Sequence, residues 1–174
     1  MTWNAHQTRG EILRAVSAAA DVRRDGVLPL DVAGARTAFA DELDLLGALQ
    51  LRWHTRLAGQ IERALMSQPL DLEQAVVTAW QATADELPGI RAVVDRHREH
   101  PLDEAMADAM AVATHKEHAA LAVMAGLAGI ADPGGARVGA LIEEKARAGH
   151  RTVRRPGVHA APNLIGRLKA ALAA

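Results

Sequence analysis

The sequence of 174 residues contains no cysteine, no tyrosine and a single phenylalanine, Phe39. Without cysteine the chain cannot form disulfides, use a thiolate nucleophile, or bind zinc or iron–sulfur clusters through sulfur. The three tryptophans and Phe39 offer little material for an aromatic cage or for a platform on which nucleic-acid bases stack. These absences exclude several classes of functional site before any motif is considered.

Long apolar runs are also absent. The longest nearly uncharged apolar run covers residues 119–131, whereas a helix that spans a bilayer needs about twenty apolar residues. The first residues lack the basic and apolar regions of a secretory signal. We therefore expect a cytoplasmic protein with no membrane insertion.

Alanine and arginine are the residues in excess, with 38 alanines and with arginine at 17 of the 20 basic positions. Both residue types lose little side-chain entropy in a helix and therefore favour it. No run alternates apolar and polar residues with period two, so we predict no sheet. The sequence thus predicts an all-α fold, an antiparallel bundle of four to five main helices followed by a short C-terminal amphipathic helix.

Turn and capping residues divide the chain into helical segments. Thr8 and Glu11 match the S/T-x-x-E pattern of a capping box, in which each side chain accepts a hydrogen bond from the backbone amide of the other residue. Pro88, Pro101 and the run that begins at Asp132 interrupt the helical pattern further along. The predicted helices cover residues 8–24, 36–66, 71–87, 90–99, 102–131, 138–148 and 163–173.

Charge is distributed unevenly along the chain. Residues 1–144 hold 13 basic and 21 acidic residues, whereas residues 145–174 hold seven basic residues and no acid. We therefore divide the chain into a helical bundle, residues 1–148, and a basic arm, residues 149–174. The arm can lie on its own acidic body or dock on a protein partner, whereas nucleic acid is disfavoured because no basic recognition helix is visible. The arm residues expected to make contacts are Arg151, Arg154, Arg155, Leu164, Ile165, Leu168 and Leu172.

Three polar residues fall on the apolar faces of predicted helices. At 100° per residue, Gln50 and His54 point close to the apolar stripe of segment 36–66, and Glu117 lies at the centre of the stripe of segment 102–131. An unpaired carboxylate is costly to bury, so Glu117 needs a partner, and His54 is the best candidate. Two interpretations stay open, a structural polar pair and a pocket for a small molecule or a metal.

Two His-x-x-His pairs, His97/His100 and His115/His118, place two imidazoles on one helix face and could chelate a divalent metal. Pro101 separates the pairs, and no histidine has an acidic residue three positions before it, which excludes the carboxylate-bridged di-iron pattern. We expect solvated histidines and no cofactor, with a divalent metal as the alternative.

No catalytic motif is present. The phosphate-binding loop, the dinucleotide-binding glycine pattern, the nucleophile elbow and the His-Glu-x-x-His zinc motif are all missing. The leading hypothesis is a non-enzymatic helical bundle, a protein-interaction or structural module with a basic C-terminal docking arm. The alternative is a bundle that binds a metal or a small molecule through Gln50, His54 and Glu117.

Overall fold

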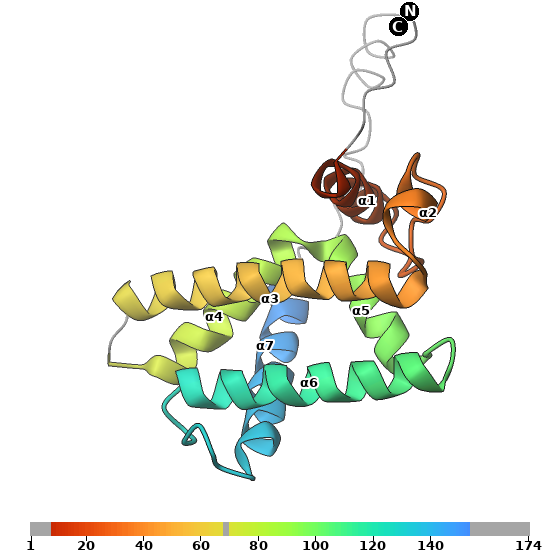
Figure 1. Cartoon of the computed structure of the whole chain (residues 1–174). Coiled ribbons are helices and arrows are strands. Elements are labelled where there is room, and N and C mark those ends of the chain that lie inside the picture. The colour runs from red at the N-terminus through yellow and green to blue at the C-terminus, as the bar shows by residue number, and fades with distance from the viewer. Residues whose placement is uncertain (1–7, 68–69, 154–174) are drawn as a thin grey trace, which may run out of the picture.

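The computed structural model describes residues 8–67 and 70–153, and within these ranges the chain forms seven helices and no strand (Figure 1). The prediction of an all-α fold is therefore confirmed. The helices are α1 (Arg9–Arg23), α2 (Ala35–Ala38), α3 (Glu42–Ser67), α4 (Leu72–Glu86), α5 (Pro88–Glu99), α6 (Glu104–Met124) and α7 (Gly135–Val153).

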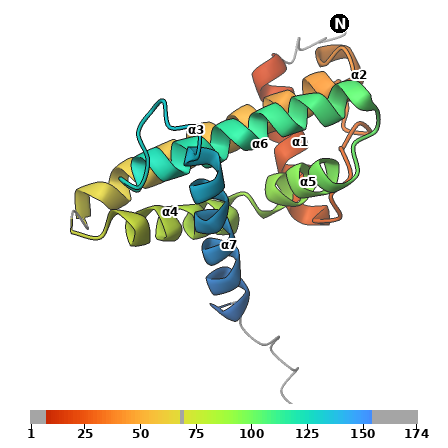
Figure 2. The same ribbon diagram turned by 90° about the horizontal axis from the view of Figure 1, so that it is seen from below.

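The two longest helices, α3 and α6, lie in one layer and run in the same direction (Figures 1 and 2). Two neighbouring helices can run in the same direction only if the chain returns between them, and here α4 and α5 return the chain from the end of α3 to the start of α6 (Figure 1). The helix α7 crosses behind this layer at a steep angle, and α1 and α2 lie at one end of the molecule (Figure 2). The most extensive packing of α3 is on α4, and that of α6 is on α7.

Local capping explains most of the helix boundaries. At the start of α1, the side chain of Thr8 accepts a hydrogen bond from the Glu11 amide, and the Glu11 carboxylate accepts one from the Thr8 amide, so the predicted capping box is confirmed. Asp71 and Asp103 cap α4 and α6 in the same way, each accepting from the amide three residues later. The helices α4 and α5 begin and end within two residues of the predicted positions.

The predicted helix over residues 36–66 is wrong in its first part. Phe39 has an extended backbone (φ −120°, ψ 133°), which separates α2 from α3. Its side chain is buried, and the guanidinium of Arg9 lies 4.4 Å from the ring centroid. The Asp41 carboxylate accepts a hydrogen bond from the Asp44 amide at 2.7 Å and so begins α3 afresh. Burial of Phe39 and this cap together outweigh the continuous helical pattern of the sequence.

The predicted helix over residues 102–131 ends earlier than expected, at Met124. Gly126 adopts a left-handed backbone (φ 70°), and the Leu127 amide donates to the Ala122 carbonyl at 2.9 Å. This is a Schellman motif, which closes a helix around a glycine. The last predicted helix of the bundle is longer than expected, because α7 extends from Gly135 to Val153.

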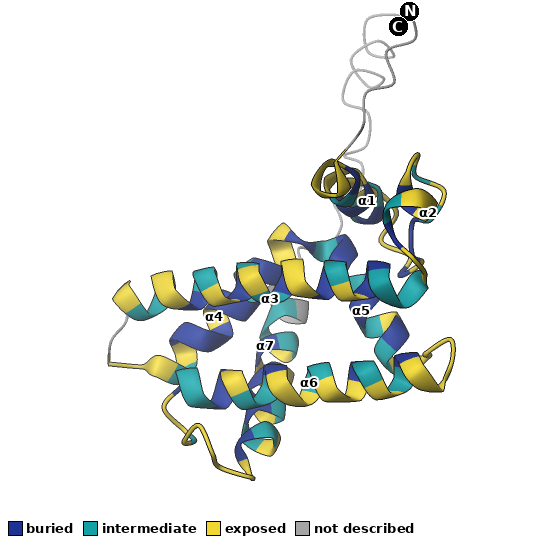
Figure 3. Cartoon of the chain, in the orientation of Figure 1, coloured by how far each residue is buried: buried dark blue, intermediate teal, exposed yellow. Residues whose placement is uncertain are grey.

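The hydrophobic core is centred on two tryptophans, Trp53 of α3 and Trp80 of α4, which pack edge to face with their ring centroids 5.7 Å apart. Leu57 and Ile61 are buried as the apolar stripe predicted. Buried and exposed positions alternate around the long helices (Figure 3). None of the described helices is long and apolar enough to cross a membrane. The largest side chains that are completely enclosed include Leu45, Leu46, Leu49, Ile90, Met106 and Leu121.

A glycine determines how α7 lies against α6. A Cβ at Gly139 would lie 1.7 Å from the carbonyl oxygen of His118, so the two backbones meet at a distance that only glycine permits. Gly89 plays the same part between α5 and α1, where a Cβ would lie 2.1 Å from the Ala20 backbone. These contacts fix the positions of α5 and α7, which supply most of the charged side chains described next.

Candidate functional site

Glu117 of α6 is a buried carboxylate with only 4% of its side chain exposed. It accepts hydrogen bonds from Nε1 of Trp53 (3.1 Å) and from the ring of His54 (Nε2, 2.8 Å), and Nη1 of Arg91 lies 3.5 Å away. Burial alone would raise the pKa of Glu117, but the hydrogen bond with His54 and the charge of Arg91 outweigh it and lower this pKa. The predicted contact between Glu117 and His54 is therefore present.

A second buried carboxylate, Glu143, projects from α7. It accepts hydrogen bonds from Arg98 of α5 (2.9 Å) and Arg147 of α7 (2.6 Å), and it pairs with the ring of His118 on α6. Burial opposes ionisation, but the hydrogen bonds of His118 and Arg98 and the charge of Arg91 hold the pKa of Glu143 far below its ordinary range. This carboxylate therefore links three helices.

Asp95 of α5 connects the two carboxylate centres. Its oxygens accept hydrogen bonds from Arg91 at 2.6 Å and from Arg147 at 2.6 and 2.9 Å. Three acidic and three arginine side chains thus alternate in a chain of contacts, so the charges inside the protein balance. We refer to these six residues as the buried ion network: Asp95, Glu117, Glu143, Arg91, Arg98 and Arg147.

The arginines of the network also stack on the core tryptophans. The guanidinium of Arg91 lies 4.7 Å from the ring centroid of Trp53, and that of Arg147 lies 5.0 Å from the ring centroid of Trp80. Such cation–π contacts are most favourable when the cation is desolvated, as Arg91 is, whereas Arg147 is half-buried. The ion network therefore extends from the core, at Arg91, Glu117 and Glu143, to half-buried positions at Asp95, Arg98 and Arg147.

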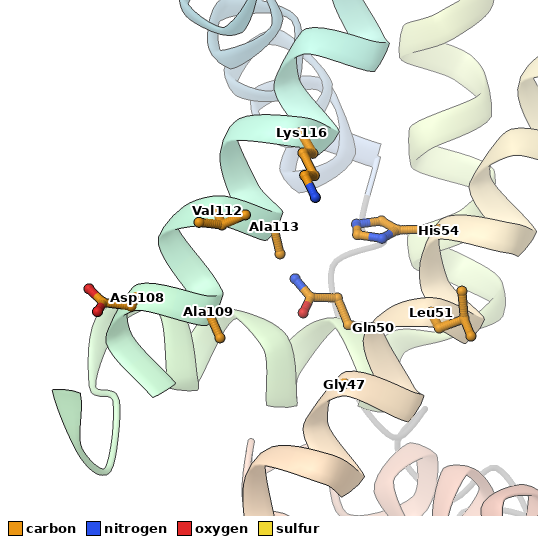
Figure 4. Close-up of a pocket in the computed structure, with 9 residues that line it drawn as sticks. All are labelled: Gly47, Gln50, Leu51, His54, Asp108, Ala109, Val112, Ala113 and Lys116. Atoms are coloured by element: carbon orange, nitrogen blue, oxygen red, sulfur yellow. The ribbon is translucent and has the colours of Figure 1, made fainter. Parts of the chain in front are cut away.

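Beside Glu117 the surface opens into a groove between α3 and α6, which we call the α3/α6 groove (Figure 4). It has a wider section of about 530 Å³ and a narrower one of about 260 Å³. Both sections are lined by His54 and Lys116, which therefore mark the waist between them. Glu117 forms part of the floor of the narrower section.

Gln50, the third predicted site residue, lies in the wall of the wider section, one helical turn before His54. Its side chain points from α3 towards α6 (Figure 4). Among the described residues, the hydrogen bonds to Glu117 come from Trp53 and His54 and not from Gln50. The structure thus brings two of the three predicted residues into contact and places the third beside them.

The two His-x-x-His pairs do not converge. His97 is buried and its Nδ1 lies 2.8 Å from the Val93 carbonyl oxygen, while His100 is exposed at the end of α5. His115 is exposed and His118 pairs with Glu143. No group of three histidine or acidic side chains in the described part of the chain is arranged to hold a metal. The expectation of solvated histidines is wrong for His97, which is buried, and for His118, which pairs with Glu143 of α7.

The contact residues expected in the basic arm fall mostly beyond the structure. Arg151 belongs to the last turn of α7. The other six lie outside the described residues: Arg154, Arg155, Leu164, Ile165, Leu168 and Leu172.

Sequence reasoning missed most of the ion network, although a signal was available. Arg91 and Asp95, like Glu143 and Arg147, are spaced four residues apart, the spacing at which opposite charges meet on one helix face. Glu143 also directly follows the buried Ile142. Such spacing is common on exposed helix faces, so it could not show that these pairs are buried.

Two features of the described residues bear on function, a fully balanced ion network and a groove with uncovered apolar walls. No protein-family model, curated protein or solved structure matches this chain. The carboxylates of the network are paired with arginines of the network and with Trp53, His54 and His118, which suits a structural role. Two apolar residues that line the wide section are left exposed, Val112 of α6 at 54% and Leu51 at the outer edge of α3 at 67%.

The buried carboxylates predict how stability depends on pH. Because the pKa values of Asp95, Glu117 and Glu143 are lowered in the folded protein, the unfolded chain binds more protons in acid. Their stabilisation is complete above the ordinary carboxyl pKa of about 4 and is lost as the pH falls below it. We expect the melting temperature to fall steeply between about pH 5 and pH 3. A melting temperature that stays constant over this interval would contradict the role given to the network.

Proposed function

We propose that this protein is a non-enzymatic interaction protein that binds an amphipathic helix of a partner protein in the α3/α6 groove. The observation that carries the proposal is the apolar groove between two parallel helices, which no part of residues 8–67 and 70–153 covers. Along α3 it extends from Gly47 to Ile61, about 15 residues or about 21 Å at 1.5 Å per residue. This length accommodates about four turns of a helix, a common size for a segment recognised in a hydrophobic groove.

The walls of the groove are suited to close helix packing. Small residues line both sides, Gly47 and Ala58 from α3 and Ala109, Ala113 and Ala120 from α6. Small side chains allow another helix to approach closely, because ridges of the incoming helix can enter the space they leave.

Larger apolar residues supply the surface that a bound helix would cover. The floor of the narrower section includes Leu57, Ile61 and Leu121, while Leu51 and Val112 stand exposed in the wider section. Covering apolar surface of this kind is the main favourable contribution to helix-in-groove binding. The basic arm predicted from the sequence adds long-range attraction to a partner of negative charge.

A single substitution can close the groove without disturbing the fold. A Cβ at Gly47 would meet no atom within 4 Å, so Gly47→Leu places its side chain in the open groove. We expect this variant to keep or slightly raise the melting temperature, because leucine favours a helix by up to about 1 kcal/mol over glycine. Its affinity for groove-binding helices should fall about tenfold or more, equivalent to about 1.4 kcal/mol.

The matched control is Gly59→Leu, because Gly59 lies on the same helix outside the lining of the groove and also faces open space. The full chain is used to select 16-residue amphipathic helices from a display library, and the affinities of the selected peptides are measured by fluorescence anisotropy. We expect binding to Gly59→Leu to equal that of the wild type. Selected peptides that bind Gly47→Leu as well as the wild type would overturn the proposal, as would a library that yields no binder.

A further inference from the structure

Two polar side chains at and beside the waist of the α3/α6 groove, the exposed Lys116 and Gln50 in the wall of the wider section, have no partner among the described residues. Gln50 is 8% exposed, and among the described residues its amide makes no hydrogen bond. Lys116 likewise forms no ion pair with any described residue. Figure 4 shows the amide of Gln50 and the ammonium of Lys116 directed into the same space between α3 and α6. The two side chains thus present an ammonium and an amide NH2 group to the same space (Figure 4), and such a pair of donors suits an anion bound from outside.

We propose that Lys116 and Gln50 recognise a carboxylate, supplied by a glutamate or aspartate at the centre of the apolar face of the bound helix. This inference rests on the proposed function, because it specifies which helix the groove accepts. The ammonium selects a negative charge and the amide donates a hydrogen bond to it.

The charged neighbours of the waist are compatible with a bound anion. Glu117 is already paired with His54 and lies near Arg91, so its charge is offset within the protein. Asp108 lines the wider section, but its carboxylate points away from Gln50 and Lys116 in Figure 4. The uncompensated charge at the waist is therefore that of Lys116.

The position of the waist favours a helix over a fatty acid. Apolar sections lie on both sides of His54 and Lys116. A helix with a central acidic residue fills both sections, whereas a fatty acid has its carboxylate at one end and fills one. The protein's own basic arm is a poor match, because residues 145–174 contain no acidic residue.

The test uses one groove-binding peptide, made in two forms that differ only by glutamate or glutamine at the centre of the apolar face. Their affinities are measured by fluorescence anisotropy for the full chain and for the variants Lys116→Met and Gln50→Leu. Lys145→Met is the matched control, because Lys145 is an exposed lysine of α7 that pairs with Glu73. Dodecanoate is added as a competitor in a separate titration.

We expect the wild type and Lys145→Met to bind the glutamate peptide about tenfold or more tightly than the glutamine peptide. Lys116→Met and Gln50→Leu should reduce this ratio to about one while still binding the glutamine peptide. If the wild type binds both peptides with equal affinity, the inference of carboxylate recognition is overturned, whereas the proposal that the groove binds a helix is still supported. If Gly47→Leu weakens the binding of both peptides, the result supports the proposed helix-binding groove. If dodecanoate displaces the peptide from the wild type but not from Lys116→Met, the site binds a fatty acid through Lys116, and the inference is overturned.

Discussion

Gly139→Ala is expected to lower the free energy of unfolding by about 3 kcal/mol or more, the upper end of the range for overpacked cores. The added methyl would lie 1.7 Å from the carbonyl oxygen and 2.4 Å from the carbonyl carbon of His118. Both are backbone atoms, so no change of rotamer can relieve the clash. α7 would have to move away from α6, which would also separate Glu143 from His118.

Equilibrium unfolding in urea measures this effect. The control is Gly59→Ala, a helix-interior glycine whose Cβ would meet nothing within 4 Å. There we expect a gain of up to about 1 kcal/mol, because alanine restricts the unfolded chain and favours the helix. If Gly139→Ala unfolds at the same urea concentration as the wild type, α6 and α7 do not pack as closely as described.

Glu143→Ala should cost about 3–5 kcal/mol, the range measured when one member of a buried ion pair is removed. The substitution leaves Arg98, Arg147 and His118 without the carboxylate that all three contact. Because these groups are largely enclosed, water can compensate only part of the lost interaction. The free energy of unfolding at pH 7 is the quantity to measure.

The adjacent Glu144 provides a matched control, because it has the same side chain on the same helix but is exposed. Its replacement by alanine should change stability by less than about 0.5 kcal/mol, as at other surface positions. A double-mutant cycle between Glu143 and Arg98 should give a coupling energy above about 1 kcal/mol. Equal effects of Glu143→Ala and Glu144→Ala would mean that the ion network adds nothing to stability.

The parts of the fold that depend on local sequence could be predicted. Capping at Thr8, the breaks at Pro88 and Pro101 and the all-α class follow from interactions between residues a few positions apart. The contact between His54 and Glu117 could also be predicted, although the two residues are 63 positions apart. It required only that both lie on apolar helix faces and that a buried carboxylate needs a partner.

The remaining features depend on how the helices meet. The break at Phe39 reflects burial of its ring, and the early end of α6 depends on a left-handed Gly126 that competes with an apolar continuation. The ion network requires α7 to lie against α6 within reach of the long side chains of α5, and the close approach of Gly139 to His118 permits this. The groove is a gap between helices, and periodicity within one helix gives no information about the distance to another.

Because α3 and α6 run in the same direction, their helix dipoles are aligned along the groove. Each helix carries a macrodipole equivalent to about half a positive charge at its N-terminus and half a negative charge at its C-terminus, and side by side the two point the same way. Asp41 and Asp103 cap the two N-termini and offset part of the resulting repulsion. A helix lying between them is favoured when it runs the opposite way, with its C-terminus beside these capped ends. If a partner helix binds as proposed, the backbone dipoles of α3 and α6 thus favour one direction for it, in addition to any preference from the side chains that line the groove.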